Sequence, residues 1–409
     1  MSDETDDWRD HARRLARFLV AEGVLSDPEW TARFEAAPRH RFIPEGMVDV
    51  GGRLADTRTW DRETLLRHGY ADQVVVTRFH SARGRRIATS SLSQPTIMAI
   101  MLELTRLADG HRVLEIGTGP GYNAYLLCAR VGDHHVTSLD VQADLVQEAA
   151  ERLAALDMFP AIVARDGWQG HPDRAPYDRV LATCSLPDIP VAWLDQLNPG
   201  ARVVAPMTFG GALAVLDRTD DGTLTGGFDT EAGFFMPMRH VGQRWPTEDP
   251  EPPGEIVATD GDAPGAALFD PDFRLWLEVA VRATEVVPYR VPGDPTAGVR
   301  VEHGDDVVDV DLGSGEVRGA ARLWRRVAAE HAAWEETGRP PRDRFGMTVT
   351  RHGQWVWLDG TGLRWPLVET PGGPPPPLSR DATGECDVVD QPGSATVARP
   401  TETSLRSAA

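Results

Sequence analysis

The first forty residues carry two helical patterns of apolar positions. Apolar side chains recur at helical spacing between Trp8 and Leu19, which predicts an amphipathic helix. A second helix is predicted directly afterwards, because Ser26 or Asp27 can cap it and Pro28 suits its first turn. Two small helices are therefore expected to open the fold.

From residue 95 to residue 207, strand-like apolar runs alternate with helical patterns. Such alternation is typical of βαβ units, whose parallel strands form a sheet that helices cover on both faces. We therefore predict an α/β fold with a doubly wound, Rossmann-like sheet. The expected strands are RVLEIG (112–117), HVTSLD (135–140), AIVARDG (161–167), YDRVLATC (177–184) and RVVAPM (202–207).

The pattern changes after residue 211. Two strand-like runs flank Asp220-Asp221-Gly222, which is a signal for a β-hairpin. The run from Phe234 to Arg239 predicts one further strand. The sheet is therefore expected to end in antiparallel strands.

A stretch rich in proline, glycine and aspartate separates the predicted sheet from a second unit. Beyond it, helix and strand patterns predict a small α+β domain that buries Trp276 and Trp324, with Trp334 as a third candidate. The end of the chain is poor in large apolar residues, which predicts disorder. The expected parts are an amino-terminal segment (1–94), the main α/β domain (95–243), a linker (244–255), the α+β domain (256–366) and a disordered tail (367–409).

The formal net charge of −20 bears on the partners of the chain. Nucleic-acid-binding proteins concentrate Lys and Arg, so no nucleic-acid partner is expected. Cys128, Cys184 and Cys386 lie far apart, which favours a reducing compartment and predicts no metal site. No apolar stretch reaches the length of a membrane span, and the acidic first residues do not resemble a signal peptide. We expect a cytoplasmic protein without a membrane partner.

A glycine-rich loop follows the first strand of the α/β region. In doubly wound sheets the ligand lies at this point, and glycines let the backbone approach it closely. Glu115 precedes the loop, and Tyr122 stands where the dinucleotide pattern G-x-G-x-x-G has its third glycine. An acidic residue there favours a cationic ligand such as S-adenosylmethionine over a pyrophosphate. The candidate cofactor-binding residues are Glu115, Gly117, Thr118, Gly119, Gly121 and Tyr122.

The next two strands also end in acidic residues. Asp140, followed by Val141, is placed to accept both ribose hydroxyls of a nucleoside. Asp166 is placed to accept the adenine amino group, and Gly167 allows a close turn. Each feature alone has a structural explanation, since glycines and Asp-Gly pairs are common in turns. The three strand ends together favour S-adenosylmethionine over a nicotinamide cofactor.

These segments resemble the protein-L-isoaspartate (D-aspartate) O-methyltransferase family. The similar stretches are APRHRFIPE (37–45), SLSQP (91–95), LEIGTGPGY (114–122), DGWQG (166–170) and APYD (175–178). The resemblance implies a class I methyltransferase fold and transfer of a methyl group to an isoaspartyl or aspartyl carboxylate of a protein or peptide. The resulting ester then closes to a succinimide.

The resemblance also implies the acceptor side of the site. Ser93 corresponds to the hydroxyl that hydrogen-bonds the accepting carboxylate, and Ser91, Gln94 and Pro95 accompany it. The alternative interpretation of Ser93 is a cap for the helix that begins near Pro95. A carboxylate is already ionised at neutral pH, so no catalytic base is needed. His40, His80 and His171 are accordingly interpreted as solvated residues, and Cys184 as a small buried side chain.

The chain departs from the family in two places. The segment before Ser93 is longer and basic, and an additional unit follows residue 243. In both respects it is similar to long homologues from bacterial peptide-maturation clusters, which form an aspartimide in a modified peptide. The alternatives are therefore general isoaspartyl methylation, a dedicated aspartyl methyltransferase, and a non-catalytic scaffold with the methyltransferase fold.

Overall fold

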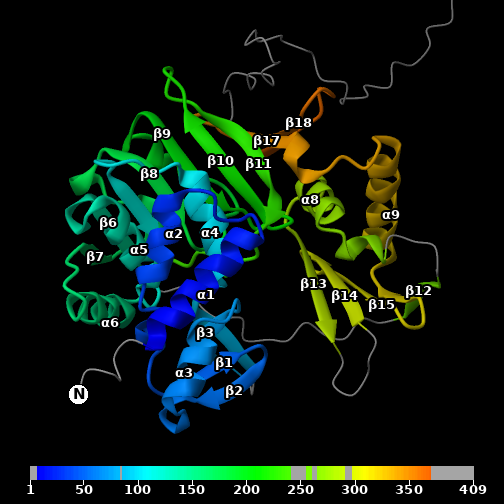
Figure 1. The fold of residues 1–409 in the computed structure, drawn as a ribbon. Coiled ribbons are helices and arrows are strands. Elements are labelled where there is room, and N and C mark those ends of the chain that lie inside the picture. The colour runs from blue at the N-terminus through cyan, green and yellow to red at the C-terminus, as the bar shows by residue number, and fades with distance from the viewer. Residues whose placement is uncertain (1–6, 83–84, 241–254, 260–264, 291–296, 370–409) are drawn as a thin grey trace, which may run out of the picture.

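The computed structural model describes residues 7–82, 85–240, 255–259, 265–290 and 297–369. A ten-stranded mixed sheet forms the centre, in the order β19-β18-β17-β11-β10-β9-β8-β5-β6-β7 (Figure 1). One half is parallel, as the alternating pattern predicted. Its strands are β5 (Val113–Ile116), β6 (Val136–Asp140), β7 (Ala161–Ala164), β8 (Tyr177–Ala182) and β9 (Leu197–Pro206).

The other half of the sheet is antiparallel. The predicted hairpin joins β10 (Ala212–Arg218) to β11 (Leu224–Ala232). Three strands from the end of the chain continue the sheet beyond β11. They are β17 (Phe345–Thr350), β18 (Gly353–Leu358) and β19 (Arg364–Glu369).

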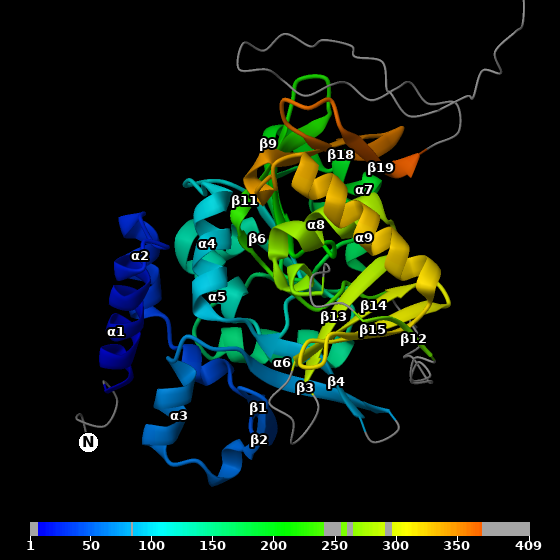
Figure 2. The same ribbon diagram turned by 90° about the vertical axis from the view of Figure 1, so that its right-hand side faces the viewer.

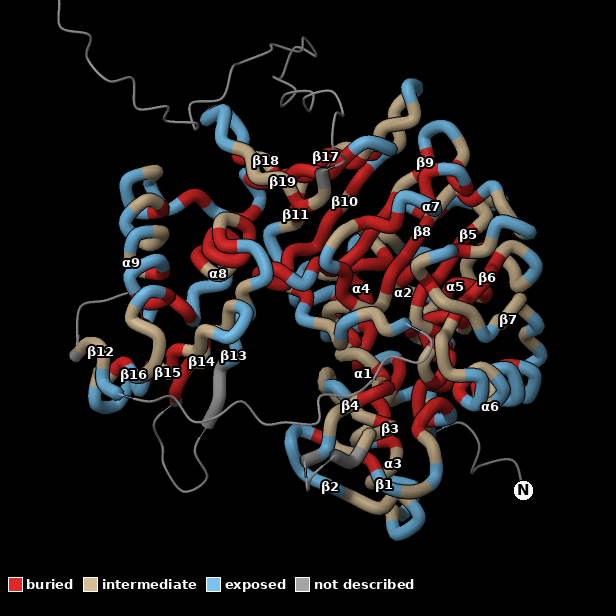
Figure 3. The backbone as a smooth tube through the Cα atoms, turned by 180° about the vertical axis from the view of Figure 1, so that it is seen from behind, coloured by how far each residue is buried: buried red, intermediate tan, exposed pale blue. Residues whose placement is uncertain are grey.

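Successive residues of the central strands face opposite sides of the sheet, because side chains alternate along a strand. Val113 packs in the core beneath the amino-terminal helices, whereas Leu114 and Ile116 pack in the core on the other face. Figure 3 shows the central strands as largely buried, whereas α6 and α9 expose much of their surface. The strands are therefore buried on both faces, as a doubly wound sheet requires.

Helices from the first half of the chain cover one face. Asp27 caps α2 by accepting a hydrogen bond from the Glu29 amide, and Pro28 is its first residue, as the sequence predicted. Figure 2 shows α1 and α2 at one side of the molecule and α9 toward the other, with α8 between them. The helices of the amino-terminal and α/β regions are α1 (Asp7–Ala21), α2 (Pro28–Ala36), α3 (Arg62–Gly69), α4 (Pro95–Thr105), α5 (Tyr122–Val131), α6 (Ala143–Ala154) and the short α7 (Val191–Leu194).

A four-stranded antiparallel sheet fills the amino-terminal segment, in the order β2-β1-β3-β4. The long, basic segment noted in the sequence forms its β3–β4 hairpin. Arg78 on β3 forms ion pairs with Asp144 and Glu148 of α6, which fasten the hairpin to the α/β region. The strands are β1 (Met47–Val50), β2 (Arg53–Asp56), β3 (Val75–Ala82) and β4 (Arg85–Leu92).

Within the described residues between 255 and 336, the carboxy-terminal unit contains two α-helices and a five-stranded antiparallel sheet. Trp276, Trp324 and Trp334 are buried in it. Its helices are α8 (Pro271–Ala280) and α9 (Ala321–Glu336). Its strands are β12 (Ile256–Thr259), β13 (Thr284–Arg290), β14 (Ala297–His303), β15 (Asp306–Asp311) and β16 (Glu316–Gly319).

The segment 256–366, expected as one α+β unit, is divided between two sheets. β17 pairs with β11 of the central sheet, β18 pairs with β17, and β19 pairs with β18, so these strands do not belong to the five-stranded sheet. This pairing covers an edge that would otherwise expose unpaired backbone groups of β11. β19 continues to Glu369, so the tail expected from residue 367 does not begin there. The predicted linker lies outside the described residues except for residue 255, as do residues 370–409.

The segment from Phe234 to Arg239 is not a strand of the central sheet, contrary to the expectation. Its only β-bridge joins Pro237 to Ser185. Proline lacks the amide hydrogen that a central strand needs, which favours departure from the sheet. The segment instead crosses the ends of the parallel strands, where the site lies.

Candidate functional site

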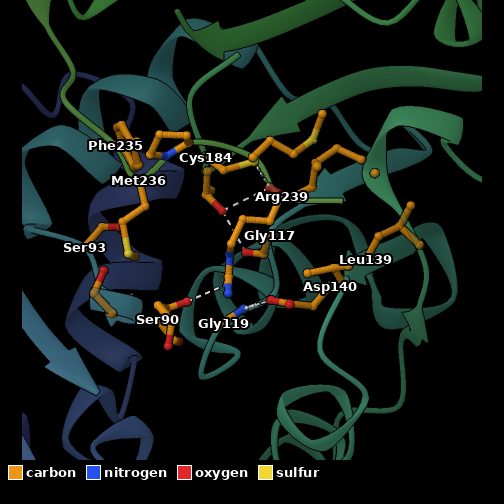
Figure 4. A pocket seen from close by; sticks show the side chains of 18 of the residues that line it. Ser90, Ser93, Gly117, Gly119, Leu139, Asp140, Cys184, Phe235, Met236 and Arg239 are labelled. Atoms are coloured by element: carbon orange, nitrogen blue, oxygen red, sulfur yellow. Dashed lines mark hydrogen bonds between the residues drawn. The ribbon is translucent and has the colours of Figure 1, made fainter. Parts of the chain in front are cut away.

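A cavity of about 360 Å³ lies beyond the carboxyl ends of the parallel strands. It is lined from the ends of β5, β6 and β8, from β4 and the start of α4, and from residues 232–239. β5 lies between β6 and β8, so the connections from β5 and β8 leave in different directions here. This is the position where doubly wound sheets bind ligands. Figure 4 shows Ser90, Ser93, Gly117, Asp140 and Arg239 around the cavity.

Two glycines of the loop after β5 have different structural roles. Gly117 has φ +101°, and a Cβ there would lie 2.7 Å from Thr183 Oγ1. It lines the cavity together with Gly119. Gly121 has φ +99° and lies against Ala149 of α6, where a Cβ would be 3.2 Å from the alanine Cβ. Gly117 therefore brings backbone to the cavity, whereas Gly121 brings two helices together.

Asp140 ends β6 at the wall of the cavity, with Val141 beside it. Its Oδ2 accepts a hydrogen bond from the Gly119 amide at 3.0 Å, and Oδ1 accepts one from the Gln142 amide at 3.0 Å. Burial raises the pKa of the Asp140 carboxyl, and these amide hydrogen bonds oppose that effect. Each oxygen retains acceptor capacity toward the cavity.

Glu115 points away from the cavity into the core. Its carboxyl is fully buried, and it accepts hydrogen bonds from Asn123 Nδ2 at 2.6 Å and from Ser138 Oγ at 2.5 Å. Thr118 Oγ1 lies 2.6 Å from the same serine hydroxyl. Burial raises the pKa of Glu115 to about 7. Glu115 and Thr118 thus support the loop from beneath, instead of facing a cationic ligand as the sequence suggested.

Asp166 and Tyr122 also lie outside the cavity lining. Asp166 accepts a hydrogen bond from the Trp168 amide at 3.0 Å and lies 3.1 Å from His240 Nδ1. Gly167 beside it does line the cavity. Tyr122 is buried, with the Arg39 guanidinium 4.9 Å from its ring centre. Of the three predicted cofactor-binding residues Tyr122, Asp166 and Gly167, only Gly167 lines the cavity.

The acceptor side of the cavity is formed by residues around Ser93. Ser91, Ser93 and Gln94 line it, whereas Pro95 is buried as the first residue of α4. The Ser93 hydroxyl makes no hydrogen bond with any residue that the structure describes. Gln94, not Ser93, occupies the cap position of α4. The alternative role of Ser93 as a helix cap is therefore wrong.

Asp72 and Arg39, which are distant in the sequence, hold the segment between Ser93 and the first turn of α4 in place. Asp72 accepts hydrogen bonds from the Thr96 amide and from Thr96 Oγ1, both at 2.8 Å, and so satisfies the start of α4. Arg39 is fully buried, and its Nη2 donates to the Ser93 carbonyl oxygen at 3.0 Å. The backbone of Ser93 is thereby fixed while its hydroxyl remains available.

His40 was expected to be solvated, and that expectation is wrong. The side chain is buried, and its Nδ1 lies 2.9 Å from the Tyr70 hydroxyl. Burial lowers the pKa of His40 to about 4. His80 and His171 are half-buried. No histidine lines the cavity in the described part of the chain.

Several lining residues were not identified from the sequence. Arg239, Phe234, Phe235 and Met236 come from the segment that was expected to be a strand. The Arg239 Nη2 donates to the Thr89 carbonyl oxygen at 2.7 Å, which links this segment to β4 across the cavity. The proline within the segment was the available signal that it leaves the sheet.

The described residues contain no group of three or more His, Cys, Asp or Glu side chains that could hold a metal ion. In the same part of the chain, no helix has the length and apolar character needed to cross a bilayer.

Comparison with known proteins gives consistent matches. Residues 58–240 match the family described as "Protein-L-isoaspartate(D-aspartate) O-methyltransferase (PCMT)". A protein-L-isoaspartate O-methyltransferase of Methanopyrus kandleri is 30% identical over 229 residues, which cover 55% of this chain and 89% of the relative. One of Methylibium petroleiphilum is 36% identical over 236 residues, covering 56% of this chain and 76% of the relative.

A solved structure titled protein-L-isoaspartate O-methyltransferase has the same fold. It is 20% identical, with a TM-score of 0.50, and the match covers 86% of this chain and 99% of that one. The first 240 of the 409 residues make up a smaller share of the chain than the 86% that this match covers. The match therefore also includes much of the chain after residue 240. The glycine loop, the Ser93 segment and the sequence matches together show that the chain belongs to the protein-L-isoaspartate O-methyltransferase family.

Proposed function

We propose that the protein methylates the free carboxylate of L-isoaspartyl residues in proteins or peptides, with S-adenosylmethionine as the methyl donor. The observation that carries this proposal is the cavity with Asp140 on one wall and the Ser93 hydroxyl on another. Family membership supports both the reaction and the cofactor.

The residues that line the cavity fit this cofactor. Asp140 offers two oxygens to the ribose hydroxyls, and Gly117, Gly119 and Gly167 leave space that a side chain would fill. S-adenosylmethionine supplies an electrophilic methyl carbon attached to a positively charged sulfur. Because Glu115 is buried below the loop, the cavity offers backbone groups and Asp140, and not Glu115, to the cationic ligand.

The reaction needs little acid–base chemistry from the protein. The accepting carboxylate is already ionised at neutral pH. A bond forms between its oxygen and the methyl carbon, the carbon–sulfur bond breaks, and a neutral thioether leaves. The neighbouring backbone nitrogen then attacks the ester carbonyl, methanol leaves, and a succinimide forms. The protein mainly orients the oxygen, which in favourable cases lowers a barrier by about 7–11 kcal/mol.

Ser93 is positioned to orient that oxygen. A hydroxyl without an internal partner can donate to one carboxylate oxygen and leave the other free to react. We expect Ser93→Ala to lower kcat about ten- to a hundredfold, because a hydrogen bond to a charged group contributes about 1.5–3 kcal/mol. The affinity for S-adenosylhomocysteine should be unchanged, whereas Ser93→Thr should retain most of the activity. An equal loss of turnover and cofactor affinity would contradict this role.

Methyl transfer to a synthetic hexapeptide tests the proposal. Label from radioactive S-adenosylmethionine should enter a peptide that contains L-isoaspartate, and the matched L-aspartyl peptide should remain unlabelled. Labelling of the aspartyl peptide, or of a dedicated precursor peptide alone, would replace general isoaspartyl methylation by aspartyl maturation. Failure with all of these acceptors would refute carboxyl methylation.

A further inference from the structure

The rim of the cavity carries an aromatic ring that is both exposed and held in place. Phe234 lines the cavity, and 59% of the residue is exposed. Its ring lies against Gly211, where a Cβ would come within 2.8 Å of Phe234 Cε1. On another side, the guanidinium of Arg274 lies 4.9 Å from the ring centre, a cation–π contact. A fixed ring with an open surface loses little conformational entropy when another molecule packs on it.

The carboxy-terminal unit supplies the contact from Arg274. Arg274 belongs to α8 and is itself held, because its Nη2 donates to the Val286 carbonyl oxygen at 2.7 Å. Glu278, one turn along α8, accepts a hydrogen bond from the Gly210 amide at 2.5 Å. A Cβ on Gly210 would lie 2.5 Å from Leu275 Cα. α8 therefore packs directly on the turn that carries Gly211 and, through it, Phe234.

A second exposed apolar residue lines the same cavity. Val74, which precedes β3, is 42% exposed. Single exposed apolar residues are common on protein surfaces. Here, however, two of them border a cavity in which a polypeptide must present a carboxylate. The segment of that polypeptide beside the carboxylate has to pass this rim.

We propose that Phe234 and Val74 form a subsite for an apolar side chain next to the isoaspartyl residue, and that Arg274 of the carboxy-terminal unit orients Phe234 within it. This inference rests on the proposed methylation of peptide isoaspartate. It gives the carboxy-terminal unit a role in substrate selection: α8 fixes the rim, and the rim selects peptides with a large apolar neighbour.

A peptide series tests the subsite. Matched isoaspartyl hexapeptides carry Leu, Ala or Ser immediately before or immediately after the isoaspartyl residue, and KM and kcat are measured for each. The wild-type protein should show a lower KM for Leu than for Ser at one of the two positions. Phe234→Ala should raise the KM for that Leu peptide about tenfold, the change that about 1.4 kcal/mol of lost contact produces. The KM for the Ser peptide should rise by a clearly smaller factor than the KM for the Leu peptide.

Matched variants separate the subsite from general damage. Phe234→Leu and Arg274→Lys should give intermediate KM values for the Leu peptide, and Val74→Ala should resemble Phe234→Ala. Phe269 is 40% exposed, belongs to the same carboxy-terminal unit and does not line the cavity, so Phe269→Ala should match the wild type. Arg274→Met should raise the same KM without changing the affinity for S-adenosylhomocysteine.

The outcomes distinguish this inference from the proposed function. If the wild-type protein methylates isoaspartyl peptides without preference at either position, the subsite is refuted while the proposed function stands. Equal loss for Leu and Ser peptides in Phe234→Ala and Phe234→Leu would also refute it. If no isoaspartyl peptide is methylated, the proposed function itself fails.

Discussion

Replacing Asp140 by alanine is expected to weaken the binding of S-adenosylhomocysteine about a hundredfold or more. Asp140 lines the cavity, and each hydrogen bond that a ribose hydroxyl donates to its carboxylate contributes about 1.5–3 kcal/mol. The substitution also removes the acceptor for the Gly119 amide, so the glycine loop loses one of its fixed points. Isothermal titration calorimetry measures the change directly.

Two further variants serve as an intermediate and as a control for the loss of cofactor affinity in Asp140→Ala. Asp140→Asn retains one acceptor oxygen and should fall between the wild type and Asp140→Ala. Asp109 lies outside the cavity with a 95% exposed side chain, so Asp109→Ala should bind like the wild type. A Kd for Asp140→Ala within about twofold of the wild-type value would show that this carboxylate does not hold the cofactor, since even one lost hydrogen bond of this kind is worth more.

The buried Glu115 should make the stability of the protein depend on pH. Burial raises its pKa from 4.5 to about 7, so between these values the folded state binds more protons than the unfolded state. The free energy of unfolding therefore falls as the pH rises through this window and levels off above it. A difference of this size corresponds to about 3 kcal/mol.

Glu115→Gln should remove this dependence. The amide oxygen of glutamine can accept from Asn123 Nδ2, and its NH₂ group can donate to Ser138 Oγ, so both contacts are kept. Relative to the wild type, the variant should gain stability between about pH 5 and about pH 8 in urea unfolding. Glu278 is also buried with a pKa raised to about 7, but it is unchanged in the variant and cancels in the comparison. Parallel pH profiles of the two proteins would contradict this account, and the exposed Glu22→Gln is the control.

The features that the sequence predicted best depend on local patterns. The parallel strands were recognisable because buried strands form continuous apolar runs. The β10–β11 hairpin was recognisable because Asp220-Asp221-Gly222 stands between two strand-like runs. The Ser93 segment and the glycine loop were identified as well, and the structure brings Ser93, Gly117 and Asp140 to one cavity.

The features that were missed depend on contacts between distant segments. The pairing of β17 with β11 joins strands that are more than a hundred residues apart, and no local pattern specifies such a partner. The direction of the Glu115 side chain follows from its partners Asn123 and Ser138, one on α5 and one on β6. The contact of Arg274 with Phe234 likewise exists only because α8 packs on a turn of the central sheet.

A crystal structure with S-adenosylhomocysteine and an isoaspartyl peptide would show whether both ligands occupy this cavity together. Asp140 is expected to accept hydrogen bonds from both ribose hydroxyls, and the peptide carboxylate is expected to lie between the cofactor sulfur and the Ser93 hydroxyl. A cofactor bound away from the ends of β5 and β6, or a carboxylate that does not contact Ser93, would contradict this arrangement.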